Sequence, residues 1–217
     1  MKNIIIGIIF GIVIITLALI PNIGKESIRT GKDEIGNNNE IVMKIDSNAE
    51  MVKSCDNIDE LQEQSDLIIQ GVVEDIEPYC DDTATVYSDY KIKITESLKG
   101  DVDKNNTIMV SDFGGVISAK EYLKYQDDPK AVDELKKYDN LDNKYVEYSF
   151  EGAWRPKKGE TYIWYLEINK VGDKVFYNPV NAYQGIFDVD GNKLERYCAD
   201  EDDSYQVKYT KEELIDK

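Results

Sequence analysis

The chain has 217 residues, of which 43 are acidic and 26 are basic, and its formal net charge at pH 7 is −17. A surface of this sign repels phosphate groups, which disfavours nucleic-acid binding. The sequence contains no histidine. This absence excludes Ser-His-Asp and Cys-His catalytic arrangements, and it excludes histidine-ligated metal centres built from this chain alone.

An apolar segment lies near the beginning of the chain. Residues 4–20 contain 14 apolar side chains among 17 and carry no charge. A helix of this length rises about 25 Å, slightly less than the hydrocarbon core of a bilayer. Because no small-residue cleavage site follows it, residues 1–24 are predicted to be a signal-anchor that spans the cell membrane once. Secretion after signal cleavage is the alternative.

The remainder of the chain carries a charge of −18, since Lys2 is the only charged side chain among the first 24 residues. Residues 25–50 have no sustained apolar period and are predicted to be a flexible linker. The folded domain is therefore expected over residues 51–217. In a protein with an N-terminal anchor, this domain lies outside the membrane, and the lipid bilayer is contacted through residues 4–20.

Short strands dominate the predicted domain. Residues 67–76 form a β-branched run in which Gly71 indicates a bulge or a bend. Residues 90–95 alternate with period two, as a half-buried strand does. Both faces of residues 161–170 are apolar, which predicts a strand covered on both sides. Further strands are predicted over residues 107–111, 145–150, 174–177 and 184–188, and Asp190-Gly191 predicts a hairpin after the last of these.

Capping signals predict a few short helices. Asn57 and Glu60 form a capping box for a helix that ends by Ser65, and Thr210 begins a similar box near the C-terminus. Residues 118–138 contain two further start signals and are predicted to be a pair of charged helices inserted between strands. The fold class is thus mainly β with short helices (α+β). We expect a small antiparallel OB-like barrel with a helical insertion, preceded by one N-terminal transmembrane helix, rather than a sandwich.

The order of four motifs resembles a known group of proteins. The motifs are SDLIIQGVV at Ser65–Val73, LKGD at Leu98–Asp101, KKGETYIWYL at Lys157–Leu166 and YQGIF at Tyr183–Phe187. Together they resemble uncharacterised exported or membrane-anchored proteins of low-GC Gram-positive bacteria. Members of that group look like small OB-like barrels, with a more distant similarity to netrin and tissue-inhibitor-of-metalloproteinase barrels. The resemblance covers residues 57–195 and implies the fold. Metalloproteinase inhibition is not implied, because that family acts through an N-terminal cysteine and this chain begins with an apolar segment.

Three cysteines allow more than one arrangement outside the membrane. Cys80 and Cys198 form a candidate disulfide, because one follows the first predicted strand of the domain and the other follows the last hairpin. Cys55 is then left over. A Cys55–Cys80 pair and three unpaired thiols are the alternatives.

Aromatic side chains offer the strongest candidates for ligand binding. Trp154 lies in a predicted loop and is a candidate for stacking on a sugar or a peptide. Tyr162 and Trp164 share one face of a strand and are expected in the core. Asp188 begins a sequence that resembles a calcium loop, but the glycine and the final glutamate of such a loop are missing. No metal, cofactor or catalytic residue is predicted.

These observations predict a membrane-anchored, extracytoplasmic binding module of the cell envelope without catalytic activity. Its partner is an envelope component or another protein. Carboxylates are the only abundant acid–base groups, so a carboxylate-dependent hydrolase acting outside the membrane is one alternative. A structural envelope protein is the other.

Overall fold

The computed structural model of the chain describes residues 39–47, 55, 57–153, 155–172, 174–196 and 208–215. The predicted anchor, and the part of the predicted linker that precedes Asn39, lie outside these ranges. Within them, no helix has the length and the apolar character needed to cross a membrane.

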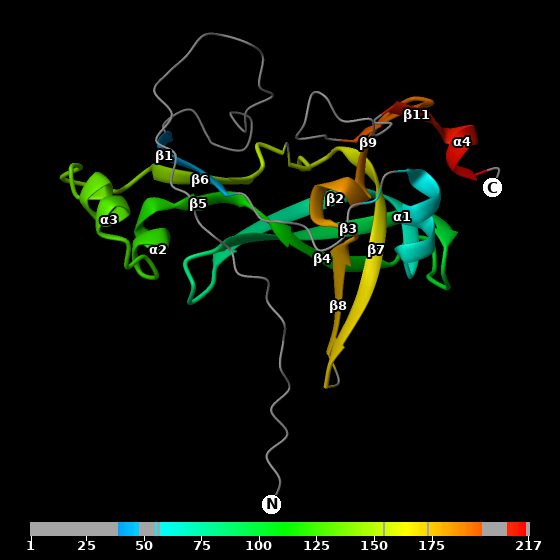
Figure 1. Cartoon of the computed structure of the whole chain (residues 1–217), viewed down its shortest axis with the longest axis horizontal. Helices are drawn as coiled ribbons and strands as arrows, with labels where there is room; N and C mark the ends of the chain where they lie inside the picture. The colour runs from blue at the N-terminus through cyan, green and yellow to red at the C-terminus, as the bar shows by residue number, and fades with distance from the viewer. Residues whose placement is uncertain are drawn as a thin grey trace, which may run out of the picture.

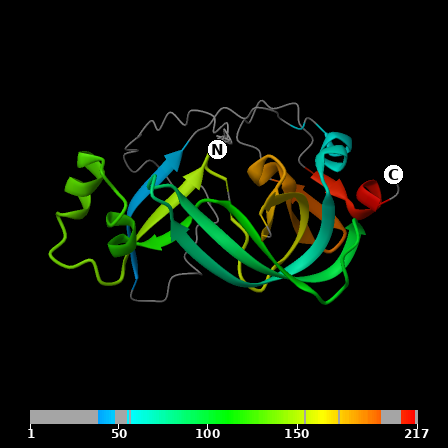
Figure 2. The same cartoon turned by 90° about the horizontal axis from the view of Figure 1, so that it is seen from below.

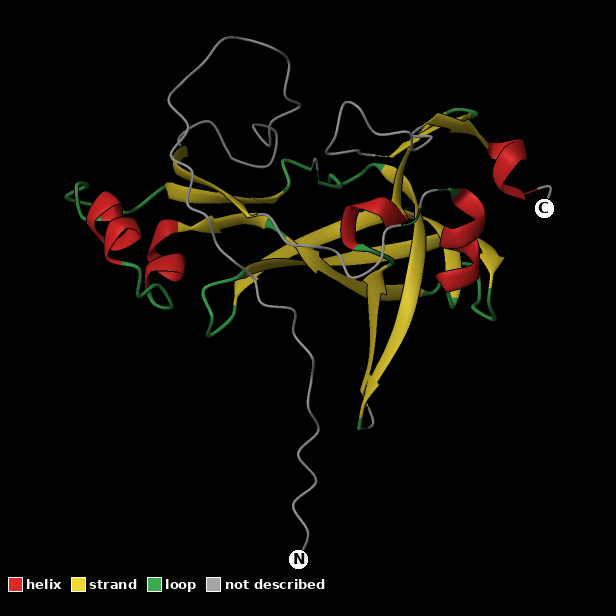
Figure 3. Cartoon of the chain, in the orientation of Figure 1, coloured by secondary structure: helices red, strands yellow, loops and turns green. Residues whose placement is uncertain are grey.

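The described part of the chain is mainly β, and its short helices lie at the periphery of the strands (Figure 3). The strands are β1 (Glu40–Ser47), β2 (Leu67–Cys80), β3 (Val86–Lys99), β4 (Thr107–Phe113), β5 (Gly115–Ser118), β6 (Lys144–Phe150), β7 (Thr161–Val171), β8 (Lys174–Pro179), β9 (Ile186–Asp190), β10 (Lys193–Arg196) and β11 (Lys208–Thr210). The helices are α1 (Ile58–Gln64), α2 (Ala119–Leu123), α3 (Pro129–Leu135), α4 (Lys211–Ile215) and the 3-10 helix η2 (Ala182–Gly185).

The larger sheet has the strand order β11-β10-β9-β7-β2-β3-β4-β8, and β8 pairs with β7 as well. Strand pairing therefore runs from β7 through β2, β3, β4 and β8 and back to β7, so these five strands form a circuit. These pairings are antiparallel except for β4 with β8, which meet in parallel at Val110 and Tyr177. Figure 2 shows the long, curved ribbons of β2 and β3 crossing the molecule.

Two glycines shape these strands. The register of β2 shifts between Gln70 and Gly71, which confirms the predicted irregularity there. A Cβ atom on Gly71 would lie 2.4 Å from Cγ2 of Ile92, so only glycine fits this close approach of β2 to β3. Gly114 has a φ of 88°, and this left-handed residue separates β4 in the larger sheet from β5 in the smaller one.

The smaller sheet has the order β1-β6-β5 and lies with α2 and α3 at one end of the molecule (Figure 1). Strand β1 pairs in parallel with β6. The linker prediction is therefore wrong for residues 40–47, and a purely antiparallel arrangement is wrong for the β1–β6 and β4–β8 pairs. Met43 and Ile45 alternate with polar residues and are buried against β6, a period-two pattern too short to stand out in the polar segment. The two predicted helices between strands are confirmed as α2 and α3.

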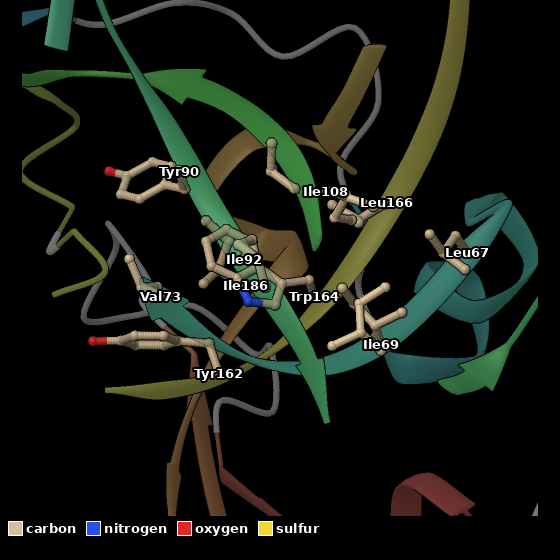
Figure 4. Packing of buried hydrophobic residues seen from close by; sticks show 12 residues of the cluster. Leu67, Ile69, Val73, Tyr90, Ile92, Ile108, Tyr162, Trp164, Leu166 and Ile186 are labelled. Carbon is tan, nitrogen blue, oxygen red and sulfur yellow. The ribbon is translucent and has the colours of Figure 1, made fainter. Parts of the chain in front are cut away.

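Strand β7 divides two apolar clusters, as its two apolar faces predict. Figure 4 shows one face, where Tyr162, Trp164 and Leu166 pack with residues of β2, β3 and β4. On the opposite face, Ile163 and Tyr165 pack against α1, β9 and β10. A third cluster lies between the smaller sheet and its two helices. The burial of Tyr162 and Trp164 in the core is thus confirmed.

The predicted caps and turns are mostly present. The Asn57 side chain accepts a hydrogen bond from the Glu60 backbone N–H and caps α1. Asp190 and Gly191 lie at the β9–β10 hairpin. The strand predicted over residues 184–188 begins only at Ile186, because the preceding residues form η2. This short helix follows Asn181, whose backbone is left-handed with a φ of 50°.

Candidate functional site

The predicted site residues lie in different places. Trp154 and Cys198 fall outside the described residues, so the stacking role of the first and the Cys80–Cys198 disulfide remain predictions. Cys55 and Cys80 belong to two different buried clusters, and no disulfide joins them. Burial raises the pKa of the Cys80 thiol to about 11, so this group is protonated at neutral pH and is a poor nucleophile.

Five aromatic rings form a continuous row that begins at the surface and ends at the buried Tyr183. The aromatic row consists of Tyr79 on β2, Tyr87 on β3, Phe113 on β4, Phe150 on β6 and Tyr183 on η2. Successive ring centroids are 5.4, 5.0, 5.7 and 6.0 Å apart. These separations are those of stacked and tilted ring pairs in direct contact.

Strand register produces one end of this row. Tyr79 lies opposite Tyr87, and Tyr87 lies opposite Phe113, on neighbouring strands. Residues that face one another across a sheet point to the same side, so three rings stand together. Tyr79 is 40% exposed and Phe113 is 39% exposed. Met109, which is also exposed, lies on the same side of β4 and extends this apolar surface.

Polar groups accompany the rings. The hydroxyl of Tyr79 lies 3.0 Å from Oγ of Ser111. Burial, with a smaller contribution from the nearby carboxylates of Asp89 and Asp81, raises the pKa of Tyr79. Burial also raises the pKa of Tyr87 to about 12. Both hydroxyls therefore stay protonated at neutral pH and present hydrogen-bond donors beside apolar ring faces.

Sequence reasoning placed the aromatic candidates in the second half of the chain and missed Tyr79, Tyr87 and Phe113. One signal was available in β3, because Tyr87 falls on the polar side of a strand that alternates with period two. The stacking of Tyr87 between rings from β2 and β4 depends on strand pairing, which no local pattern specifies.

A buried carboxyl was also missed. Asp112 is only 9% exposed and lies on the side of β4 that carries the buried residues Ile108 and Val110. It is in register with Ser88, which is also buried. Burial raises the pKa of Asp112 from 3.8 to about 7, and a backbone hydrogen bond from Phe113 opposes this shift. Among the described residues, Asp112 is therefore the carboxyl whose environment most resembles that of a general acid.

A cavity of about 430 Å³ lies where the two sheets meet. Residues of β2, β3, β5 and β6 line it together with the segment that precedes β7. Ser88 contributes to its wall, whereas its neighbour Tyr87 belongs to the aromatic row. Since successive strand residues point to opposite sides, the cavity and the row occupy opposite faces of β3.

Within the described ranges, no group of three or more cysteines and carboxylates is placed to hold a metal ion. Comparison with known proteins adds no assignment, since neither a family model nor a curated protein matches the sequence.

Proposed function

We propose that this protein is a membrane-anchored, extracytoplasmic binding module of the cell envelope, and that it acts without catalysis through the aromatic row. The observation that carries this proposal is the contact of five rings from four strands and a 3-10 helix, two of them about 40% exposed. Exposed ring faces bordered by hydroxyls suit stacking on sugars or on peptide side chains.

The strand pairings support an OB-like barrel as the scaffold. In chain order, the five strands β2, β3, β4, β7 and β8 form a circuit in which the third pairs in parallel with the fifth. A closed circuit of this size is filled by side chains, as in small OB-like barrels. Three of the four motifs that resemble exported proteins of low-GC Gram-positive bacteria start or turn these strands, and the fourth leads into β9. Together with the apolar residues 4–20, they support the proposed anchor and the location outside the membrane.

Asp112 is the specific observation that favours the alternative hydrolase. A general acid near neutral pH needs a raised pKa, and burial gives Asp112 this property. A carboxylate mechanism also needs a second acid beside the scissile bond. Two carboxylates, Asp75 and Glu160, line the cavity, but Asp112 does not. The binding module is therefore the better supported function, ahead of the hydrolase and of a purely structural role.

The aromatic row can be tested with matched variants of the full-length chain in detergent micelles. The probes are cell-wall material and membranes isolated separately from a Gram-positive bacterium. Tyr79→Ala removes the ring at the exposed end of the aromatic row, and Phe113→Ala removes the ring at its centre. Tyr125→Ala is the control, because Tyr125 is 39% exposed and lies outside the row.

The proposal expects that at least one fraction retains the wild-type protein and the Tyr125→Ala variant equally. Each row variant should bind that fraction at least about fivefold more weakly, since an aromatic stacking contact contributes about 1 kcal/mol. Equal retention of all four proteins on every fraction would refute binding through the row. Circular dichroism spectra establish that the variants are folded.

A further inference from the structure

The cavity between the two sheets combines apolar and charged side chains in its lining. Ile76 and Val116 supply aliphatic surface, and Tyr145 supplies aromatic surface. Arg155 belongs to the charged part of the lining. A volume of about 430 Å³ falls within the usual range of sites for small molecules.

The charge of this lining is opposite to that of the whole chain. Glu147 lies between two cations, with Lys44 Nζ 2.7 Å from one carboxylate oxygen and Arg155 Nη2 3.4 Å from the other. This group of three therefore carries a net charge of +1. Of these three residues, only Arg155 lines the cavity. Lys158 and Asp75, which line it too, form a neutral pair at 2.6 Å. The charges of the other two charged lining residues, Lys157 and Glu160, cancel. The lining therefore carries one net positive charge, in a protein whose formal net charge is −17.

Arg155 has hydrogen-bond donors that the described residues leave without an acceptor. Its side chain is only 13% exposed. Nη1 donates to the backbone oxygen of Tyr148 at 3.2 Å, and Nη2 donates to Glu147 at 3.4 Å. A guanidinium has five N–H donors, and the described residues provide no acceptor for the other three. A largely buried cation with spare donors favours an anion that accepts two of them in parallel.

We propose that this cavity binds a small organic anion, with a carboxylate or phosphate group held by Arg155 and an apolar body lying against Tyr145 and Ile76. The site is separate from the aromatic row, because the two lie on opposite faces of β3. Its ligand is also different in kind. Exposed rings at the surface suit a polymer, whereas a concave space beside one guanidinium suits a single small molecule.

The test uses three probes of similar size that differ in charge, namely benzoate, phenyl phosphate and neutral benzamide. Binding is followed by ¹⁵N chemical-shift titration of the full-length chain in detergent micelles. Arg155→Gln removes the charge and the donors, and Arg155→Lys keeps the charge but removes the planar pair of donors. Lys120→Gln is the control, because Lys120 forms an exposed ion pair with Asp142 away from the cavity lining.

The proposal expects saturable shifts with at least one anion, at residues that line the cavity. Benzamide should bind at least about tenfold more weakly than benzoate. Arg155→Gln should lose at least that factor, Arg155→Lys should retain part of the affinity, and Lys120→Gln should match the wild type. A stronger response to benzoate would identify carboxylates as the ligands, and a stronger response to phenyl phosphate would identify phosphates.

Two results would overturn the proposal. One is the absence of saturable shifts with both anions, and the other is equal affinity of the wild type and Arg155→Gln. Neither result affects the proposed function, because that function depends on retention by envelope fractions through Tyr79 and Phe113. Conversely, if the aromatic row binds no envelope fraction, the affinities expected in the anion titration stay the same.

Discussion

Substitution of Asp112 by asparagine tests the most unusual ionisable group in the structure. The carboxyl lies on the inward side of β4 beside the apolar core and is 9% exposed. Burial accounts for the rise of its pKa from 3.8 to about 7, and no charge in the described residues contributes to this shift. Asparagine keeps the size and the acceptor oxygen of the side chain but cannot ionise.

The magnitude follows from linkage between protonation and folding. Each pKa unit corresponds to about 1.4 kcal/mol, so the shift between 3.8 and about 7 corresponds to about 4 kcal/mol of unfolding free energy. Because the native state binds a proton more tightly than the unfolded chain, this contribution is fully present below about pH 4. It is lost as the pH rises through about 7.

The assay is urea unfolding of the full-length wild type and of Asp112→Asn at several pH values from about 5 to about 8. The stability of the variant relative to the wild type should grow by about 1.4 kcal/mol per pH unit between about pH 5 and about pH 7. Above about pH 7 it should level off at about 4 kcal/mol. Asp101→Asn is the control, because Asp101 lies in the exposed turn after β3. If the difference in unfolding free energy between Asp112→Asn and the wild type did not change with pH, the conclusion that burial raises the pKa of Asp112 would be refuted.

Three further substitutions test the packing of the fold by the same unfolding measurement. Gly71→Ala should destabilise by about 2 kcal/mol or more, because its Cβ would lie 2.4 Å from Cγ2 of Ile92 in a packed core; wild-type stability would show that β2 does not approach β3 so closely. Asn57→Ala should lose about 1 kcal/mol through the missing cap of α1, whereas Asn57→Ser should lose much less; equal losses would contradict the capping role. Trp164→Phe should destabilise the protein by clearly less than the roughly 3–5 kcal/mol typical of Trp→Ala in a core. The buried Nε1 of Trp164 has no hydrogen-bond partner among the described residues, so its removal relieves a desolvation cost. Equal losses for Trp164→Phe and Trp164→Ala would contradict this account.

Much of the local structure could be predicted from short sequence patterns. The cap at Asn57, the two helices between β5 and β6, the irregularity at Gly71 and the hairpin at Asp190-Gly191 each depend on a few neighbouring residues. The burial of Trp164 followed from the two apolar faces of β7. Where the pattern was short, as in β1, the prediction failed. Eight residues with three buried positions do not separate a strand from a polar linker by periodicity alone.

The candidate sites depended much less on local patterns. Trp154 was chosen because of its loop, and it lies outside the described residues. The aromatic row required Tyr79, Tyr87 and Phe113 to come into register from three strands. No sequence pattern distinguishes Asp112 from the other acidic residues, which number 43 in all. Only the pairing of β4 shows that its side chain lies on the side that faces the core.

The chain has a strong negative charge and no histidine, and these two facts by themselves disfavour nucleic-acid binding and exclude histidine-based catalysis. They do not locate the charge. Only the tertiary structure decided that the lining of the cavity between the two sheets, with Arg155 in it, carries one net positive charge. The physical reason is that capping, turn chemistry and alternation act over a few residues of chain, whereas a site is made by side chains brought together through the pairing of distant strands.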